Sequence, residues 1–248
     1  MKSDDWQENV MLKKNNCTDK KKTEDKALIG AGLNFASREA YNRLRTNISF
    51  AFVGDDSAKV IGISSACPRD GKSTISLNLA YSLGEAGYKV LLMDADMRRP
   101  SICASLDIPR APGLSNLLAG SDDVPMHEGV LHKNVTVLTS GDIPPNPAEL
   151  IGSRKMQSVI EKFKETYDYI VVDLSPVLAV SDTIAISKYI DGVIIVAKHS
   201  STKRRDITEV IRQLNYANAK ILGFVYNKVG HSVSRRKNAY GYYTENYK

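Results

Sequence analysis

The chain has 248 residues, of which 42% are hydrophobic and 25% are charged. This balance is typical of a globular protein, and the length suits one large domain with tails better than two full domains. The formal net charge is +6, but the basic residues are scattered and form no stripe interleaved with aromatics, so the sequence argues against a nucleic-acid-binding protein.

The N-terminal part divides into a polar segment and a first helix. Residues 1–35 are rich in Lys, Asp and Asn, which predicts a flexible N-terminal tail. The main domain then opens with a segment, residues 36–53, in which Ala40, Leu44 and Ile48 fall four apart. This spacing predicts an amphipathic helix.

Short apolar runs alternate with helical segments through the rest of the main domain, residues 36–230. Strands are predicted at residues 59–64, 88–93, 135–138, 169–173, 192–197 and 221–226, and the clearest helices at residues 72–86 and 154–166. Continuous apolar strands separated by helices predict an α/β fold with a mostly parallel sheet and helices on both faces. In such a sheet the functional groups are expected at the carboxyl ends of the strands.

A phosphate-binding motif, SACPRDGKST, follows the first predicted strand and opens a helix. Backbone N–H groups and the helix N-terminus favour phosphate oxygens at such a loop. Lys72 is expected to reach the β- and γ-phosphates of ATP, and the Ser73 hydroxyl to bind Mg²⁺. The predicted nucleotide-binding residues are Asp70, Gly71, Lys72, Ser73 and Thr74. The motif thus predicts a P-loop NTPase fold with ATP and Mg²⁺ as cofactors.

The loop departs from the common pattern G-x-x-x-x-G-K-[ST] at its first glycine, which is Ala66 here. Gly71 is the only glycine within the loop. Arg69 therefore either has an ordinary backbone conformation or carries strain, because a residue with a side chain enters the left-handed region only at a cost.

Three carboxylates follow predicted strands. Asp94 and Asp96 leave the end of one strand on the same side, because they are two residues apart. Asp173 ends an apolar run in the position of a Walker B acid. Beside a P-loop, such acids hold Mg²⁺ through its water ligands or take a proton from an attacking hydroxyl. The predicted catalytic residues are Lys72, Asp94, Asp96 and Asp173, and the predicted metal-facing residues are Ser73, Asp94 and Asp173.

Several segments together resemble the bacterial tyrosine kinases (BY-kinases), which regulate capsular and extracellular polysaccharide synthesis. The resemblance runs from about residue 39 to residue 248, most of the chain. Its motifs are EAYNRLRTN at 39–47, the PxxGKST end of the phosphate loop, MDADMRRP at 93–100, GLSNLL at 113–118, GDIPPNPAEL at 141–150 and the tyrosine-rich tail at 231–248. Together these motifs are highly specific, whereas each alone is not.

The resemblance implies a MgATP-dependent kinase that phosphorylates tyrosines in its own tail, between the subunits of a ring. It implies that Asp94 is the Walker A′ acid, near the metal and the tyrosine hydroxyl, with Asp96 assisting. Ring assembly is expected through Glu39 and Arg45. The implied partners are a membrane adaptor of the polysaccharide co-polymerase type, whose cytoplasmic end activates the kinase, and a cognate tyrosine phosphatase.

The C-terminal tail carries the expected phosphate acceptors. Four tyrosines lie within eight residues: Tyr240, Tyr242, Tyr243 and Tyr247. The tail has no core periodicity, so nothing in it is expected to bury these rings. Phosphorylation would add about −1.5 to −2 charges at each accessible tyrosine. A low-complexity, adhesive end is the alternative interpretation.

Cysteine usage and hydropathy predict the compartment. Cys17, Cys67 and Cys103 include no Cys-x-x-Cys pair, which favours reduced thiols in the cytoplasm. The N-terminus lacks the apolar stretch of a signal peptide, and no apolar run approaches the ~20 residues that span a bilayer. We expect a cytoplasmic protein held at the inner face of the plasma membrane by an adaptor that is a separate chain.

Three segments differ from the BY-kinase pattern. The phosphate loop of the family usually reads Pro-Gly-Glu-Gly-Lys, and this one has Arg69 and Asp70 in the middle. The Walker B acid is usually followed by x-Pro-Pro, and here Ser175 takes the place of the first proline. The oligomerisation motif Glu-x-x-Arg-x-x-Arg has Asn42 at its central arginine. Arg43 lies about 100° further around the helix and cannot simply replace that arginine.

Two other functions stay open. A deviant Walker A ATPase of the partition or positioning type shares the expected fold, but it carries an extra lysine where this chain has Cys67. A nucleotide-binding scaffold of a polysaccharide export complex needs little catalysis, and the departures at Arg69, Ser175 and Asn42 favour it.

Overall fold

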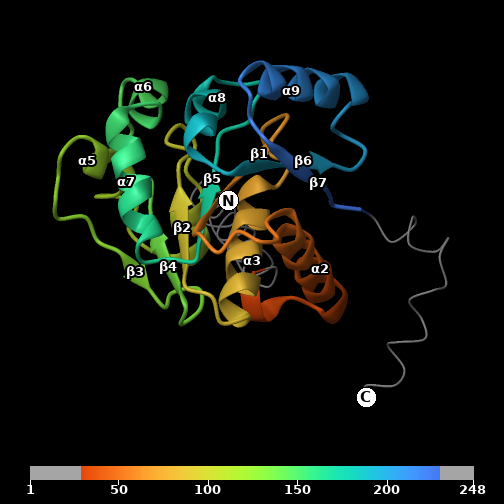
Figure 1. The fold of residues 1–248 in the computed structure, drawn as a ribbon, viewed down its shortest axis with the longest axis horizontal. Coiled ribbons are helices and arrows are strands. Elements are labelled where there is room, and N and C mark those ends of the chain that lie inside the picture. The colour runs from red at the N-terminus through yellow and green to blue at the C-terminus, as the bar shows by residue number, and fades with distance from the viewer. Residues whose placement is uncertain (1–28, 230–248) are drawn as a thin grey trace, which may run out of the picture.

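A computed structural model describes residues 29–229 of the chain (Figure 1). The tyrosine-rich tail, most of the predicted N-terminal tail and Cys17 lie outside the described residues. Residues 29–35 were predicted as tail, but they belong to the folded part. Gly30 is buried, and its N–H donates to the Asn78 side chain over 2.8 Å. The folded domain therefore begins at least as early as Ile29.

The strands of the described residues form one seven-stranded sheet in the order β3-β4-β2-β5-β1-β6-β7. Their bounds are β1 (Lys59–Ser65), β2 (Val90–Asp94), β3 (His127–Glu128), β4 (Val135–Leu138), β5 (Tyr169–Asp173), β6 (Gly192–Lys198) and β7 (Ile221–Asn227). Every neighbouring pair is parallel except β3 and β4. The six predicted strands are confirmed. The sequence did not signal β3, because its two residues are polar and partly exposed.

Helices lie on both faces of the sheet, as predicted (Figure 1). Their bounds are η1 (Gly30–Gly32), α2 (Phe35–Ala51), α3 (Lys72–Glu85), α4 (Ile102–Leu106), α5 (Leu114–Leu118), α6 (Pro147–Ile151), α7 (Arg154–Lys164), α8 (Asp182–Ile186), η2 (Ser187–Tyr189) and α9 (Arg204–Tyr216). The predicted first helix is α2, and Asn34 begins it by accepting a hydrogen bond from the Ser37 N–H over 2.9 Å. An asparagine at this position satisfies one of the free N–H groups of the first turn.

The core follows from the alternation of side chains along the strands. On β2, Val90 and Leu92 pack with α2 and α3, whereas Leu91 and Met93 pack with α5, α6 and α7. Successive side chains of a strand point to opposite faces, so a strand covered on both faces must be apolar throughout. The strands appear as continuous apolar runs in the sequence because both faces of the sheet are covered.

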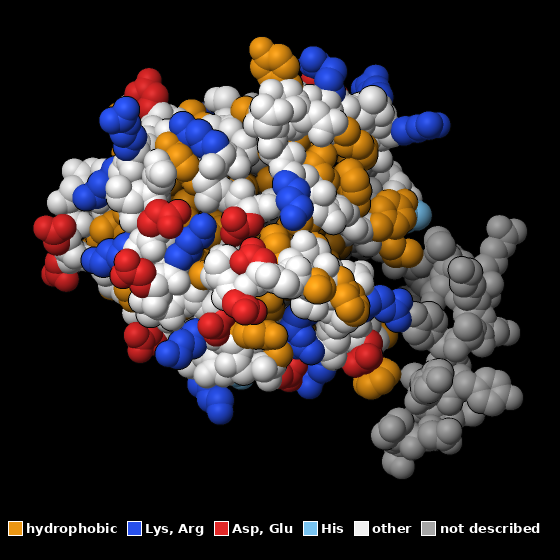
Figure 2. Space-filling model, in the orientation of Figure 1, with side chains coloured by type: hydrophobic (Ala, Val, Ile, Leu, Met, Phe, Trp, Pro, Cys, Tyr) orange, Lys and Arg blue, Asp and Glu red, His pale blue; other side chains and the backbone are white. Residues whose placement is uncertain are grey.

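The described residues include no helix whose length and hydropathy would let it cross a bilayer. On the face drawn in Figure 2, basic and acidic side chains are interspersed between white and orange patches. This mixed pattern is typical of a solvated surface.

The carboxyl ends of the central strands bring the predicted site together. β2, β5 and β1 are neighbours in the sheet, and Asp94 lies directly opposite Asp173 in the β2–β5 register. The phosphate loop, residues 66–71, leaves the end of β1 and leads into α3. Three segments that are far apart in the sequence therefore meet at one edge of the sheet.

Candidate active site

The phosphate loop ends at a glycine whose backbone no other residue adopts easily. Gly71 has φ +101° and begins α3 without a side-chain cap. The Asn227 side chain, at the end of β7, donates to the Asp70 carbonyl over 2.9 Å and lies against Gly71. A Cβ atom at Gly71 would overlap Asn227 Nδ2. Backbone conformation and space therefore both require glycine here.

We expect Gly71→Ala to weaken nucleotide binding by at least about tenfold, because alanine is strained at φ +101° and its Cβ pushes away the Asn227 side chain that holds the loop. Isothermal titration with MgATP measures the change. Gly87→Ala is a matched control, since Gly87 also has positive φ (+97°) but has no neighbour within 4 Å among the described residues. Equal affinities for the two variants would contradict this assignment of Gly71.

Arg69 has φ +69°, so of the two alternatives for this position the structure shows the strained one. A side chain in this region costs on the order of 1 kcal/mol. Asp70, which we predicted to bind nucleotide, is buried, and its Oδ2 accepts the Cys67 N–H over 3.1 Å. The Asp70 side chain therefore stabilises the loop through a hydrogen bond within it. Asp70 is not among the residues that line the pocket.

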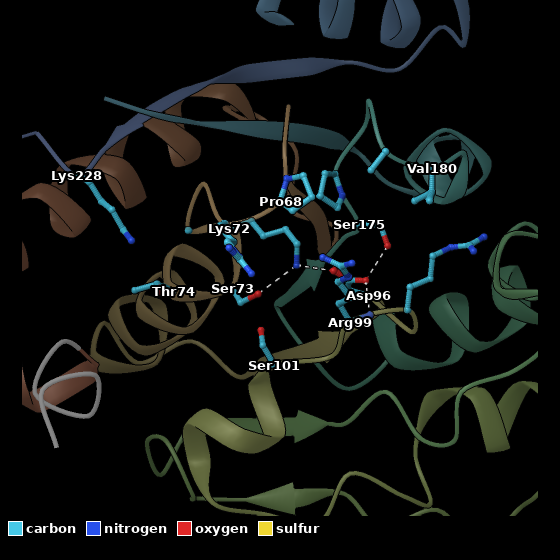
Figure 3. Close-up of a pocket in the computed structure, with 15 residues that line it drawn as sticks. Pro68, Lys72, Ser73, Thr74, Asp96, Arg99, Ser101, Ser175, Val180 and Lys228 are labelled. Atoms are coloured by element: carbon cyan, nitrogen blue, oxygen red, sulfur yellow. Dashed lines mark hydrogen bonds and ion pairs between the residues drawn. The ribbon is translucent and has the colours of Figure 1, made fainter. Parts of the chain in front are cut away.

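A pocket of about 890 Å³ opens beside the loop (Figure 3). The predicted residues Gly71, Lys72, Ser73 and Thr74 line it, together with Asp96. Four further cationic side chains join Lys72 in the lining: Arg69, Arg98, Arg99 and Lys228. Such a lining favours a ligand with several negative charges, as the phosphates of a nucleotide have.

Lys72 lies at the centre of a buried charge cluster. Its Nζ is 2.8 Å from Asp96 Oδ2 and 3.4 Å from Asp173 Oδ2. Burial alone would lower the pKa of Lys72, but the negative charges of Asp173 and Asp96 outweigh it and raise that pKa. Lys72 is therefore held in its charged form, as contact with phosphates requires.

Asp94 and Asp173 are fully buried behind the lysine. Burial, together with the charge of Asp173, raises the pKa of Asp94 to about 8, although the N–H groups of Ile102 and Asp96 donate to it. Burial also raises the pKa of Asp173, whose Oδ1 accepts the Ser76 hydroxyl over 3.1 Å. Two carboxylates that favour protonation mark a place where added positive charge would be stabilising.

Asp96 differs from Asp94, because it lines the pocket with Lys72. Its Oδ1 accepts the Arg99 N–H over 3.1 Å and the Ser175 hydroxyl over 3.0 Å. Burial would raise the pKa of Asp96, but Lys72 and these two donors hold it below its usual value. Asp96 is therefore the ionised acid that faces the pocket, and Asp94 lies behind it.

The donor set fits a magnesium ion. Mg²⁺ prefers oxygen ligands and is commonly held by one or two carboxylates, a hydroxyl and the phosphates of the substrate, with water completing the shell. The Ser73 hydroxyl lines the pocket and accepts a hydrogen bond from Lys72 Nζ over 3.2 Å. Within residues 29–229, no group of three His, Cys, Asp or Glu residues could hold a metal alone. A site completed by nucleotide phosphates is consistent with both observations.

Two residues near the site belong to no sequence motif, and the sequence did not predict a role for them. Asn227 holds the phosphate loop from the end of β7. Asp182, at the start of α8, is buried and paired with Arg98 over 2.9 Å. Ser175 was noticed only as a departure from the family pattern, yet its hydroxyl contacts Asp96. No sequence signal distinguishes these polar residues from ordinary loop residues.

The predicted oligomerisation residues lie on α2. Arg45 Nη1 donates to the carbonyl and the hydroxyl of Ser82 on α3, over 2.6 and 3.0 Å. Asn42 donates to Glu39 over 3.0 Å, and its Oδ1 accepts the Ser82 hydroxyl over 3.3 Å. Arg45 and Asn42 thus attach α2 to α3 within the chain, and Glu39 is exposed. The role of Glu39 and Arg45 in assembly stays a prediction.

The parallel sheet, the loop before α3 and the acids at the strand ends define a P-loop NTPase, a nucleotide-binding fold. A family model described as an AAA domain matches residues 58–222. The chain is 37% identical to the tyrosine-protein kinase YwqD of Bacillus subtilis (strain 168) over 208 residues, which cover 83% of this chain and 85% of YwqD. The chain belongs to the family of bacterial tyrosine-protein kinases.

Solved structures agree with this family. The chimerical protein CapA2B2 matches with a TM-score of 0.72 at 34% identity, covering 77% of this chain and 84% of that one. The kinase domain of the Escherichia coli tyrosine kinase ETK matches with a TM-score of 0.73 at 31% identity, covering 77% of this chain and 75% of that one.

The fold is shared more distantly with a different class of ATPase. The septum site-determining protein MinD of Pyrococcus horikoshii OT3, solved with Mg-ADP, matches with a TM-score of 0.59 at 26% identity, covering 70% of this chain and 72% of that one. Both TM-score and identity are lower than for the kinases, so the partition-type alternative is not the better supported one.

Proposed function

We propose that the chain is a protein-tyrosine kinase that uses MgATP to phosphorylate the tyrosines of its own C-terminal tail and thereby regulates capsular or extracellular polysaccharide synthesis. One observation carries the proposal: Lys72 and the ionised Asp96 pair over 2.8 Å on the wall of a cationic pocket. Family membership makes tyrosine the expected acceptor, and the tail supplies Tyr240, Tyr242, Tyr243 and Tyr247.

In this proposal each residue of the site has a separate role in phosphoryl transfer. Lys72 turns from Asp96 to the β- and γ-phosphates, and Ser73, Asp94 and Asp173 face the metal. Bound Mg²⁺ would neutralise charge on the transferred phosphoryl group. Asp96 lines the pocket and Asp94 does not, which favours Asp96 as the carboxylate that receives the proton of the tyrosine hydroxyl.

The test is to incubate the purified chain with MgATP, alone and with the cytoplasmic peptide of an adaptor, and to map phosphotyrosine by mass spectrometry. A protein that ends at Ala239 lacks all four tail tyrosines and is expected to lose at least about 90% of the phosphotyrosine, because accessible acceptors are removed while the pocket is untouched. Unchanged binding of MgATP by the shortened protein is the control. A shortened protein that is still fully phosphorylated would refute the acceptor assignment.

The same assay separates the alternatives. ATP hydrolysis without phosphotyrosine in the wild type would favour a partition-type ATPase, whose fold MinD shares. MgATP binding with neither activity would favour a scaffold of an export complex. Phosphotyrosine that appears only with the adaptor peptide would support the kinase and its activation by that partner.

We further propose that the kinase works in the cytoplasm, at the inner face of the plasma membrane, as part of an assembly. Family resemblance supports a ring of subunits, formed with Glu39 and Arg45, a membrane adaptor of the co-polymerase type and a cognate tyrosine phosphatase. Phosphorylated tails would repel one another through their added charge and so release subunits. Light scattering of samples before and after incubation with MgATP follows this change.

A further inference from the structure

The loop after β5 places the Ser175 hydroxyl between the carboxylates of Asp96 and Asp182. Figure 3 shows its contact with Asp96. Ser175 is 1% exposed, and its Oγ lies 3.0 Å from Asp96 Oδ1 and 3.3 Å from Asp182 Oδ2. A serine hydroxyl has one hydrogen to donate. It can therefore serve only one of the two acids fully.

Asp182 is already satisfied by another donor. Arg98 approaches it with two nitrogens, Nε over 2.9 Å to Oδ2 and Nη2 over 3.1 Å to Oδ1. Paired hydrogen bonds of this kind between arginine and a carboxylate are among the stronger ones in proteins. The hydroxyl hydrogen of Ser175 is thereby left to Asp96, which is also the nearer acid.

The backbone of Ser175 is held in place from two sides. Its carbonyl accepts the Thr183 hydroxyl over 2.6 Å, from α8, and the Ser64 hydroxyl over 2.7 Å, from β1. These two hydrogen bonds fix the backbone of Ser175, so its side chain reaches Asp96 without any rearrangement.

The contact sets the direction in which Asp96 points. Ser175 and the Arg99 N–H both donate to Oδ1, which leaves Oδ2 toward Lys72 and the pocket. When Lys72 turns to the phosphates of a nucleotide, Oδ1 keeps both of its donors. The carboxylate then still presents Oδ2 to the reacting groups.

We propose that Ser175 is a positioning residue, which holds Asp96 with Oδ2 toward the acceptor hydroxyl while the Asp182–Arg98 pair keeps the serine hydroxyl available. This inference rests on the proposed kinase function. The contact is particular to the sequence of this chain, because a proline, which the family usually has at this position, has no hydroxyl to donate.

The test compares kcat and KM for MgATP in the phosphotyrosine assay. Ser175 also lines the pocket, but its hydroxyl is turned to Asp96. Ser175→Ala is therefore expected to lower kcat about tenfold, because one hydrogen bond to a charged group is lost. KM and the affinity for MgATP should be unchanged, because the phosphate loop is untouched. Ser175→Thr keeps the hydroxyl and is expected to recover at least about half of the rate.

Ser187→Ala is the matched control, because Ser187 is also a buried serine. Within residues 29–229 its hydroxyl donates only to the Ile184 carbonyl, over 2.8 Å. Its kcat should equal that of the wild type, and melting curves of all variants should show folded proteins.

The proposal is overturned by a Ser175→Ala rate within about twofold of the wild type, by an equal loss in Ser187→Ala, or by a folded Ser175→Thr as slow as Ser175→Ala. A wild type that hydrolyses ATP without forming phosphotyrosine refutes the kinase function alone, and the same comparison is then made on hydrolysis. A wild type with neither activity overturns both.

Discussion

Lys72→Met is expected to reduce phosphotyrosine formation by at least about 100-fold, because the variant lacks the cation that meets the charge of the transferred phosphoryl group. The ammonium of Lys72 lies within 3.4 Å of both Asp96 and Asp173, so methionine also leaves these buried acids without their cation. Quantitative immunoblotting against phosphotyrosine after incubation with MgATP measures the loss.

Lys59→Met provides the control for this experiment. Lys59 is also buried and pairs with Asp55 over 2.8 Å. It is the first residue of β1, however, and so lies at the amino end of the strand, away from the pocket. Its variant loses a buried lysine and an ion pair without touching the site. The assignment of Lys72 would be wrong if both variants, shown to be folded by circular dichroism, lost activity equally.

Asp94→Asn is expected to separate activity from stability. Activity should fall by at least about 100-fold, because an amide replaces an acid at the metal-facing side of the site. In the absence of nucleotide and Mg²⁺, however, the variant should be more stable than the wild type at pH 8. The buried carboxyl of Asp94 has a pKa of about 8, far above its ordinary value of 3.8, since burial and Asp173 oppose its ionisation.

The sign of the pH dependence follows from this raised pKa. Between about pH 4 and pH 8 the folded wild type holds a proton on Asp94 that the unfolded chain has released. The stabilising effect of that proton is complete below about pH 4, decreases as the pH rises from about 4 to about 8, and is lost above that pH. Between these two pH values, this group lowers the free energy of unfolding by up to about 1.4 kcal/mol per pH unit.

Thermal melts of wild type and Asp94→Asn at pH 5, 6, 7 and 8, without nucleotide and metal, check the expectation. The advantage of the variant should grow with pH, because asparagine has no proton to release. Asp122→Asn, at an exposed loop position, should keep the wild-type pH profile. An advantage that is the same at every pH would contradict the raised pKa of Asp94.

The sequence predicted the sheet and the main acids well, for an identifiable reason. Each strand of a parallel sheet covered on both faces must be apolar along its whole length, so β1, β2 and β5 appear as apolar runs. A parallel sheet also collects the residues after its strands at one edge. The sequence alone therefore groups Lys72, Asp94, Asp96 and Asp173 at one site.

The residues that hold this group in place were not predictable in the same way. Asn227 is the last residue of β7 and Asp182 is the first residue of α8. Both are single polar residues, and neither belongs to a motif with fixed spacing. Their partners, Asp70 and Arg98, lie more than 80 residues away along the chain. Such contacts depend on how the elements pack, which local sequence does not encode.

The class of the fold, the phosphate loop and the identity of the acids could be read from the amino-acid sequence, because hydrophobic periodicity and short motifs are local properties. The differences among those acids come from the packing of the folded chain. The fold buries Asp94 and Asp173 completely, places Asp96 in the lining of the pocket and gives Asp96 the hydroxyl of Ser175. These differences arise because burial and hydrogen bonding set the charge and direction of a carboxylate, and both depend on neighbours that are distant in the chain.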